Sequence, residues 1–334
     1  MKKIIVNLGE RKYPIIIGES IKKAGIFLKK LNISGKIFVI TNTVVKKLYF
    51  DTLEKSLKTS GFSVYSIAIP DGESYKNIET LKELYFNAVK SRIDRSCAVI
   101  AFGGGVVGDI AGFFSATYMR GIPYIQIPTT LLAMVDSSVG GKTGVDLKEG
   151  KNLIGAFYQP KAVIIDVSLL NTLPEKQIKN GLSEVVKYGI ISDKKLFEHL
   201  EKKVSGKNKI DSNDWKNIIY NCCKIKAGVV EKDEFENKGL REILNFGHSF
   251  GHAIETLTNY DKYLHGEAIS IGMNMASRLA VKKRIFSFEN QQKVESLLKK
   301  IGLPVSLKEK LRPETMIFMM LRDKKTRNGK LRFV

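Results

Sequence analysis

The chain has 334 residues, of which 43% are hydrophobic and 27% charged, and it carries a formal net charge of +21. This composition excludes a disordered chain, predicts two domains at about 150 residues each, and contains no apolar run near the roughly 20 residues that span a bilayer. The charge raises nucleic acid as a partner, but the lysines are scattered and no nucleic-acid-binding motif is present. We therefore expect a solvated lysine-rich surface, no nucleic-acid or membrane partner, and an anionic small substrate.

Two features of the sequence predict a cytoplasmic protein. Met1–Glu10 contains two lysines and a short apolar run, well below the apolar length of a secretory signal. The three cysteines are too few for a disulfide framework, and the adjacent pair Cys222-Cys223 lacks the spacing of metal or redox sites. We expect all three to be reduced and buried.

Short β-branched runs alternate with amphipathic stretches from the amino terminus to about residue 170. This alternation predicts a largely parallel sheet covered by helices, in a first domain over residues 1–170. The predicted strands are Ile4–Val6, Ile15–Ile17, Lys36–Thr41, Val64–Ile69, Ala98–Phe102, Tyr124–Ile127 and Ala162–Ile165.

A glycine-rich turn follows the predicted strand Ala98–Phe102. Gly103, Gly105 and Gly108 have the G-x-G-x-x-G spacing, which lets backbone N–H groups and a helix amino terminus approach phosphate oxygens. The acidic residue that usually follows about 20 positions later is missing. The turn therefore indicates either a dinucleotide site in a variant arrangement or a tight structural turn.

A polar segment lies downstream of the turn. Asp136–Gly144 surrounds Lys142 with small hydroxyl residues and glycines, and Lys151-Asn152 follows. Such a segment combines hydrogen-bond donors with close backbone approach, which suits phosphate or hydroxyl recognition. A flexible surface loop is the alternative.

Beyond Pro174 the β-branched runs disappear, and apolar residues recur every three to four positions. The second domain, residues 171–334, is therefore predicted to be nearly all helix. The predicted helices lie near residues 175–190, 212–232, 241–259, 265–283 and 288–301.

Three of the four histidines are close together in this helical half. His248 and His252 are four residues apart and so share one helical face, and His265 follows near the start of the next helix. Two histidines one turn apart with a third ligand nearby suit zinc with an open coordination position. Hydrogen-bonded helix histidines are the alternative. Spacing by itself nominates these three histidines as ligands.

Taken together, these motifs resemble the 3-dehydroquinate synthase family. The resemblance implies an NAD-binding α/β lobe, a Rossmann-like variant with a mostly parallel sheet, followed by an all-α lobe with metal and substrate residues. The matching segments are Asp71-Gly72-Glu73 with Lys76, Gly103–Asp109, Arg120-Gly121 with Pro128–Leu132, Asp136–Gly144, Lys151-Asn152, Glu184–Gly189, Arg241 with Asn245–His252, His265–Ala268 and Asp323-Lys324-Lys325.

The resemblance also implies the site residues. For the metal, zinc with cobalt as an alternative, it implies Glu184, His248 and His265, so that Glu184 takes the place of His252. The residues that it implies for NAD are Asp71, Gly72, Glu73, Ser74, Tyr75, Lys76, Gly105, Val106, Val107, Gly108, Asp109, Thr129, Thr130, Asp136, Lys142, Lys151, Leu169, Leu170, Asn171 and Thr172. The residues that it implies for catalysis and substrate binding are Arg120, Lys142, Asn152, Lys187, Lys226, Arg241, Asn245, His252 and Lys324.

The activity implied by the resemblance is the conversion of 3-deoxy-D-arabino-heptulosonate 7-phosphate to 3-dehydroquinate and phosphate, a step of aromatic amino acid biosynthesis through the shikimate pathway. Transient oxidation by NAD, phosphate elimination, re-reduction and an intramolecular aldol closure make up the reaction. A homodimer is implied as well, because in related enzymes the residue that matches Arg120 reaches a neighbouring subunit's site. The alternatives are another sugar phosphate cyclase, such as 2-deoxy-scyllo-inosose synthase, or a metal-dependent glycerol-type dehydrogenase. Arg241 and Lys226 favour a substrate with a carboxylate.

Overall fold

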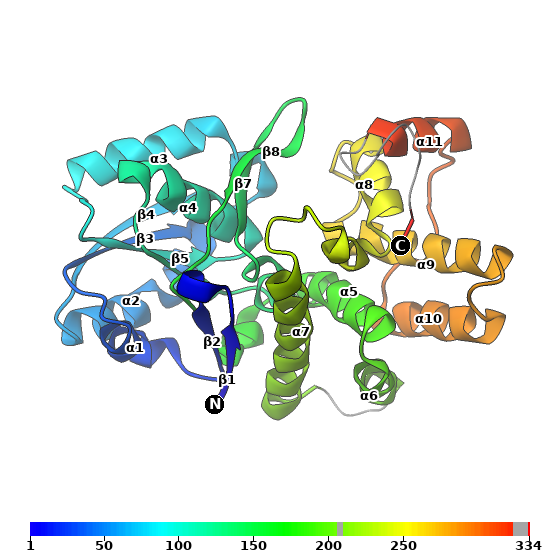
Figure 1. Ribbon diagram of the computed structural model, residues 1–334, viewed down its shortest axis with the longest axis horizontal. Coiled ribbons are helices and arrows are strands. Elements are labelled where there is room, and N and C mark those ends of the chain that lie inside the picture. The colour runs from blue at the N-terminus through cyan, green and yellow to red at the C-terminus, as the bar shows by residue number, and fades with distance from the viewer. Residues whose placement is uncertain (206–209, 323–332) are drawn as a thin grey trace. The chain divides into compact units, whose positions relative to one another are not determined.

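The computed structural model describes residues 1–205, 210–322 and 333–334, which form two compact units (Figure 1). The first unit comprises Met1–Leu173 and Ser212–Phe235, and the second comprises Pro174–Asp211 and Glu236–Val334. Lys324, one of the predicted substrate residues, lies outside the described residues. No helix among the described residues has the length and apolar character needed to cross a bilayer.

The first unit is built on a seven-stranded sheet with the strand order β1-β2-β9-β6-β5-β3-β4. Only β1 and β2 pair antiparallel, and the other neighbours are parallel. Every predicted strand lies in this sheet, so the prediction of a largely parallel sheet is confirmed. The strands are β1 (Lys2–Val6), β2 (Tyr13–Ile17), β3 (Lys36–Asn42), β4 (Ser63–Ile69), β5 (Ala98–Gly103), β6 (Tyr124–Pro128) and β9 (Ala162–Ile165).

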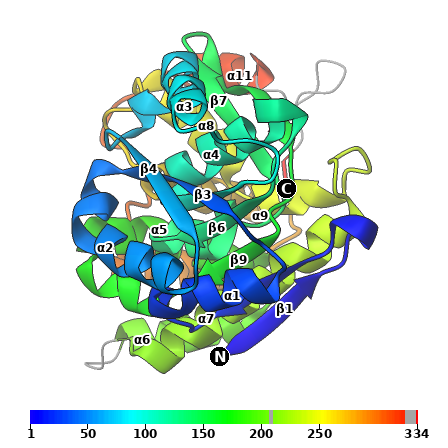
Figure 2. The ribbon, with the colours of Figure 1, turned by 90° about the vertical axis from the view of Figure 1, so that its left-hand side faces the viewer.

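Helices cover both faces of this sheet, with α3 and α4 on one face and α1 and α2 on the other (Figures 1 and 2). All residues of β5 are buried, as expected for a central parallel strand covered on both faces. On the α4 side, Phe114 packs against Phe38 of β3 and stacks on Tyr85 and Tyr118. The helices on the two faces are α1 (Ala24–Lys30), α2 (Thr43–Thr59), α3 (Ile78–Lys90) and α4 (Gly105–Thr117).

A two-stranded antiparallel hairpin, β7 (Lys142–Leu147) and β8 (Gly150–Phe157), occupies the polar segment for which the sequence predicted no strands. Gly144 and Gly155 face each other across it. A Cβ on Gly155 would lie 2.2 Å from the Thr143 carbonyl oxygen, so the two backbones approach more closely than a side chain allows. Glycine has low β-propensity, so the residues that permit this approach also conceal the strands from pattern analysis.

The chain returns to the first unit for one more helix, α7 (Ser212–Lys232). This helix packs against β1 and β2, and the Lys2 ammonium donates a 2.6 Å hydrogen bond to the side-chain oxygen of Asn217. By chain order α7 follows residue 171, where the helical domain was predicted to begin, but in space it belongs with the sheet. This placement brings Lys226 into the first unit.

The described residues of the second unit form helices and connecting turns, in agreement with the predicted helical half. The predicted stretch 241–259 is divided: a 3-10 helix covers Leu240–Asn245, the chain turns at Gly247 with φ +77°, and α8 begins at His248. His248 is therefore the first residue of a helix. The helices are α5 (Glu175–Ile191), α6 (Lys194–Ser205), α8 (His248–Leu257), α9 (His265–Lys282), α10 (Phe288–Ile301) and α11 (Pro313–Arg322).

A polar network centred on the buried carboxylate of Glu295 joins α9 to α10. Glu295 of α10 accepts hydrogen bonds from Lys299 (2.7 Å), from Arg278 of α9 (2.9 Å) and from Gln291 (3.0 Å). These donors lower the pKa of Glu295 to about 2, and the hydrogen bond from the Lys299 ammonium has the largest effect. The carboxylate is therefore ionised at neutral pH. These contacts join the later part of the helix that begins with His265 to α10.

Candidate metal centre and cofactor-binding edge

Three helices of the second unit bring Glu184, His248 and His265 together. Glu184 comes from the middle of α5, while the two histidines are the first residues of α8 and α9. Glu184 Oε1 lies 3.5 Å from His248 Nε2 and 3.8 Å from His265 Nε2, and one ligand atom from each residue lies within 4.8 Å of the other two. One carboxylate and two imidazoles form a donor set that binds zinc and leaves a coordination position open.

The burial of Glu184 fits a bound cation. Its side chain is only 1% exposed, and its Oε2 pairs with the ammonium of Lys187, which is also buried and lies one turn further along α5. Its Oε1 faces the two imidazoles and has no hydrogen-bond partner among the described residues. Burying a polar oxygen without a partner is costly, and a divalent cation held by Glu184, His248 and His265 would remove that cost.

His252 stands beside this cluster. Its ring centroid lies 5.5 Å from that of His248, one turn away on α8, and 6.4 Å from that of His265. The helical spacing therefore did predict a neighbour of His248. The three residues whose ligand atoms converge nevertheless include Glu184 and not His252, because α5 supplies a carboxylate from a distant part of the sequence.

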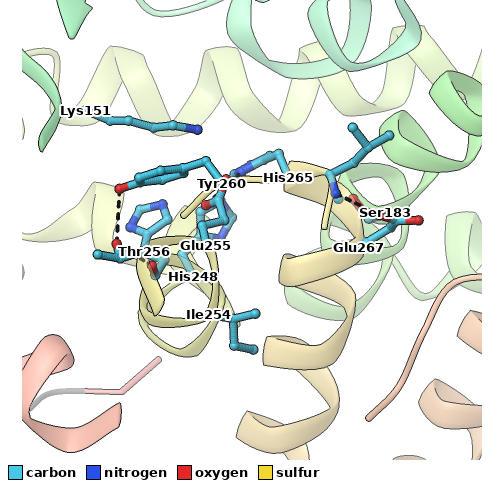
Figure 3. Close-up of polar contacts among 12 residues, drawn as sticks. Lys151, Ser183, His248, Ile254, Glu255, Thr256, Tyr260, His265 and Glu267 are labelled. Carbon is cyan, nitrogen blue, oxygen red and sulfur yellow. Dashed lines mark hydrogen bonds and ion pairs between the residues drawn. The ribbon is translucent and has the colours of Figure 1, made fainter. Parts of the chain in front are cut away.

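The amino terminus of α9 is fixed to α5, and this contact sets the position of His265. The backbone N–H of Gly266 donates a 2.5 Å hydrogen bond to Asn180 Oδ1, and Asn180 lies one turn before Glu184 on α5. Glu267 accepts a 2.7 Å hydrogen bond from the Leu264 N–H and caps the same helix end (Figure 3). One helix thus provides a ligand and also holds the helix that carries another. Sequence analysis missed Asn180, because nothing in its local pattern distinguishes it.

Substitution of Gly266 by alanine should weaken zinc binding about 10- to 100-fold, the usual effect of disturbing the surroundings of a ligand. The added Cβ would lie 2.2 Å from the Asn180 carbonyl oxygen, so α9 must shift and take His265 with it. Zinc dissociation constants from chelator competition measure the effect. Gly228→Ala is the matched control, because a Cβ at this position in α7 meets nothing within 4 Å and should leave zinc affinity unchanged. Equal zinc affinity in the two variants would show that the contact is unimportant.

Four of the predicted substrate residues that the structure describes also belong to the second unit. Lys187 follows Glu184 on α5 and His252 follows His248 on α8. Arg241 and Asn245 lie on the 3-10 helix that packs against α5 and precedes α8. Arg241 and Lys187 are 2% and 1% exposed, which is unusual for cations and marks them as more than solvating surface groups.

In the first unit, the predicted NAD residues gather at one edge of the sheet. Because the strands concerned are parallel, the segments that follow them start at the same edge. Asp71–Lys76 follows β4, Gly105–Asp109 follows β5, Thr129-Thr130 follows β6, and Leu169–Thr172 follows β9. The glycine turn leads directly into α4, whose amino terminus is at Gly105. These segments form the carboxyl edge, where open α/β sheets bind their ligands.

Lys76 ties the carboxyl edge to the β7–β8 hairpin. Lys76 as a whole residue is only 3% exposed. Its ammonium lies 2.6 Å from Asp109 Oδ2 and 2.5 Å from Asn152 Oδ1. Burial alone would lower the pKa of Lys76, but the carboxylates of Asp109 and Glu73 outweigh it and the pKa is raised. Lys76 is therefore a buried cation at neutral pH, shared between α4 and the hairpin.

Asp146 holds the hairpin residue Asn152 in place. Its Oδ1 accepts a 2.7 Å hydrogen bond from the Asn152 N–H, and its own N–H donates a 2.7 Å hydrogen bond to the Lys76 carbonyl oxygen. Asn152 adopts the left-handed conformation with φ +53°. Sequence analysis passed over Asp146, whose only local signal is its place in the polar segment.

The three remaining predicted substrate residues of the first unit differ in their surroundings. Lys226 of α7 lies 2.9 Å from Asp136 Oδ2 and donates a 2.8 Å hydrogen bond to the Asp136 carbonyl oxygen. The structure therefore joins a predicted substrate residue to a predicted NAD residue. Lys142 is exposed at the start of β7, and Arg120 is exposed in the turn after α4 with φ +65°.

Comparison with known proteins gives matches over nearly the whole chain. The family model described as 3-dehydroquinate synthase N-terminal matches residues 66–180, and the one described as 3-dehydroquinate synthase C-terminal matches residues 181–326. The 3-dehydroquinate synthase of Desulforamulus reducens is 50% identical over 335 residues, which cover 100% of this chain and 93% of the relative.

Solved structures with the same fold come from two other synthases. A 2-deoxy-scyllo-inosose synthase complexed with carbaglucose-6-phosphate, NAD⁺ and Co²⁺ has a TM-score of 0.87 and 28% identity, covering 97% of this chain and 88% of that one. The 2-epi-5-epi-valiolone synthase of Streptomyces hygroscopicus subsp. jinggangensis, with NAD⁺ and Zn²⁺ bound, has a TM-score of 0.86 and 28% identity, covering 94% and 87%.

Proposed function

The chain belongs to the 3-dehydroquinate synthase family, and from this membership we propose that it converts 3-deoxy-D-arabino-heptulosonate 7-phosphate to 3-dehydroquinate and phosphate. It is then a phosphate-eliminating carbon–oxygen lyase of aromatic amino acid biosynthesis through the shikimate pathway. The structural observation that carries the proposal is the convergence of Glu184, His248 and His265 from three helices. A cytoplasmic homodimer is part of the proposal, with Arg120 reaching the neighbouring subunit's site.

The two units take different parts of this function. The first is proposed to bind NAD along the carboxyl edge, with the amino terminus of α4 facing the diphosphate. The second is proposed to hold zinc, or cobalt, through Glu184, His248 and His265. The cofactors bound in the two structural relatives, NAD⁺ with Co²⁺ or Zn²⁺, support this division. The proposed domain boundary is at residues 170 and 171; the compact units divide at Leu173 and Pro174, and α7 belongs to the first unit.

When bound, NAD accepts and returns a hydride and the metal polarises a substrate hydroxyl. The protein's own side chains bind and orient the substrate. In the second unit, the buried cations Lys187 and Arg241 provide charge for its phosphate and carboxylate, while Asn245 and His252 provide hydrogen bonds. In the first unit, Lys142, Asn152 and Lys226 are the proposed substrate residues, and Lys324 is proposed with them. Much of the rate enhancement then comes from positioning, because the substrate's own phosphate serves as the base.

A phosphate-release assay tests this proposal. Purified protein with the heptulosonate phosphate, NAD⁺ and zinc should release phosphate without a lasting rise in absorbance at about 340 nm, because each hydride taken up is returned. Removal of the metal with a chelator should stop the release, and added zinc should restore it. Turnover of glucose 6-phosphate without turnover of the heptulosonate would indicate an inosose synthase instead. Net NADH accumulation with glycerol-type alcohols would indicate a dehydrogenase.

A further inference from the structure

His265 lies between two carboxylates that have different functions. Its Nε2 faces Glu184, the proposed ligand, at 3.8 Å from Oε1, and its Nδ1 lies 3.4 Å from Oε2 of Glu255 (Figure 3). Glu255 is only 3% exposed and lies on α8, two turns after His248. A buried carboxylate requires a donor, and the imidazole N–H is a donor that faces it.

The position of Glu255 determines which nitrogen of His265 carries the proton. In a neutral imidazole one nitrogen is a donor and the other an acceptor. A carboxylate only accepts, so it favours the tautomer with the proton on Nδ1 and leaves the Nε2 lone pair directed toward Glu184. The opposite tautomer would direct the Nδ1 lone pair at the Glu255 oxygen, which is repulsive, whereas a lone pair on Nε2 would be directed at the cation that Glu184 also binds. A metal ligand has to present a lone pair, and the tautomer that Glu255 favours leaves that lone pair on Nε2 of His265.

The other histidine ligand obtains the same tautomer in a different way. His248 Nδ1 lies 3.1 Å from the carbonyl oxygen of Phe246, two residues earlier in the chain. This acceptor is local and is present wherever the turn before α8 forms. His265 begins α9, and the acceptor at its Nδ1 comes from another helix. The acceptor at Nδ1 of His265 is therefore a side chain that can be replaced.

We propose that Glu255 is a positioning residue of the metal centre, which fixes the ring and tautomer of His265 so that Nε2 binds a divalent zinc or cobalt ion. The inference rests on the proposed metal site and adds a residue outside the ligand set. Outer carboxylates of this kind strengthen the ligand's basicity and hold its orientation, and their loss typically costs 10- to 100-fold in metal affinity.

Zinc dissociation constants of Glu255→Ala and Glu255→Gln, measured by competition with a chromophoric chelator, test the proposal. We expect Glu255→Ala to bind zinc about 10- to 100-fold more weakly than the unmodified chain. Glu255→Gln keeps an oxygen acceptor without the charge and should lie between the two. The matched control is Glu309→Ala, because Glu309 bonds to the Tyr263 hydroxyl, two residues before His265. Its zinc affinity should stay within about twofold of the unmodified chain, since it is outside the surroundings of the ligands.

The outcomes separate this inference from the proposed function. An unmodified chain that does not bind zinc overturns the proposed metal centre, whereas tight binding in both the unmodified chain and Glu255→Ala overturns only the role of Glu255. If Glu255→Ala folds poorly by circular dichroism, the zinc-loaded unmodified protein gives the answer through long-range ¹H–¹⁵N correlation spectra of its histidines. A proton on Nδ1 of His265 supports the proposal, and a proton on Nε2 overturns it.

Discussion

Substitution of Glu184 by alanine is expected to weaken zinc binding roughly 10³-fold and to remove phosphate release with it. Apparent zinc-binding free energies of about 10–16 kcal/mol are shared among a few ligands, so one ligand contributes about 4 kcal/mol, or roughly three powers of ten. The loss should be larger than for a surface carboxylate, because Glu184 Oε1 is buried and faces both imidazoles. His248→Ala and His265→Ala should behave in the same way.

His252→Ala is the informative comparison, because this residue stands beside the cluster without belonging to the converging set. It should retain zinc and lose rate, which separates a residue that contacts substrate from a ligand. Metal content by atomic emission, zinc dissociation constants and phosphate release distinguish the two. Retention of zinc by Glu184→Ala, together with its loss in His252→Ala, would return the ligand set to the three histidines nominated by spacing.

Lys76→Met should destabilise the first unit by about 2–4 kcal/mol in urea unfolding. Removing one partner of a buried ion pair leaves the other charge uncompensated, which typically costs about 3–5 kcal/mol. We expect somewhat less here, because the Asp109 side chain retains 21% exposure and can recover some hydration. NAD affinity should fall as well, because Lys76 holds both α4 and Asn152 of the hairpin.

A second substitution and a surface control show where the loss of stability in Lys76→Met comes from. Adding Asp109→Asn to Lys76→Met removes the stranded charge, so stability should recover in large part while NAD binding stays weak. Lys58→Met breaks an exposed pair with Glu54, in which the Lys58 side chain is 59% exposed, and should cost about 0–1 kcal/mol. If Lys76→Met costs no more than Lys58→Met, the buried pair does not have the structural role given to it here.

The sequence by itself determined the fold class and the family. Runs such as Ala98–Phe102 are continuously apolar and include β-branched residues, and this pattern identifies strands covered on both faces whatever the details of packing. The switch to a three-to-four-residue period beyond Pro174 identified the helical half in the same way. The glycine turn was visible because Gly103, Gly105 and Gly108 have a fixed local spacing, which predicts a dinucleotide site or a tight structural turn.

Two elements of the fold were beyond the reach of such patterns. The β7–β8 hairpin is rich in glycine where Gly144 and Gly155 let the backbones meet, so it lacks the signature of a strand. Helix α7 has the period of its helical neighbours in the sequence, yet it packs on β1 and β2. A period reports the element that a residue forms, and it does not report the partner against which that element packs.

The metal centre shows most clearly the difference between what local sequence patterns predict and what tertiary packing decides. Sequence spacing relates residues on one element, so it found His248 and His252 as neighbours on a helix. It had no means of selecting Glu184, which only the family resemblance supplied, because α5 meets the starts of α8 and α9 solely through packing. Asn180 was missed for the same reason. Which side chains a sequence contains is a local property, but which donor atoms converge depends on how buried helices are held together.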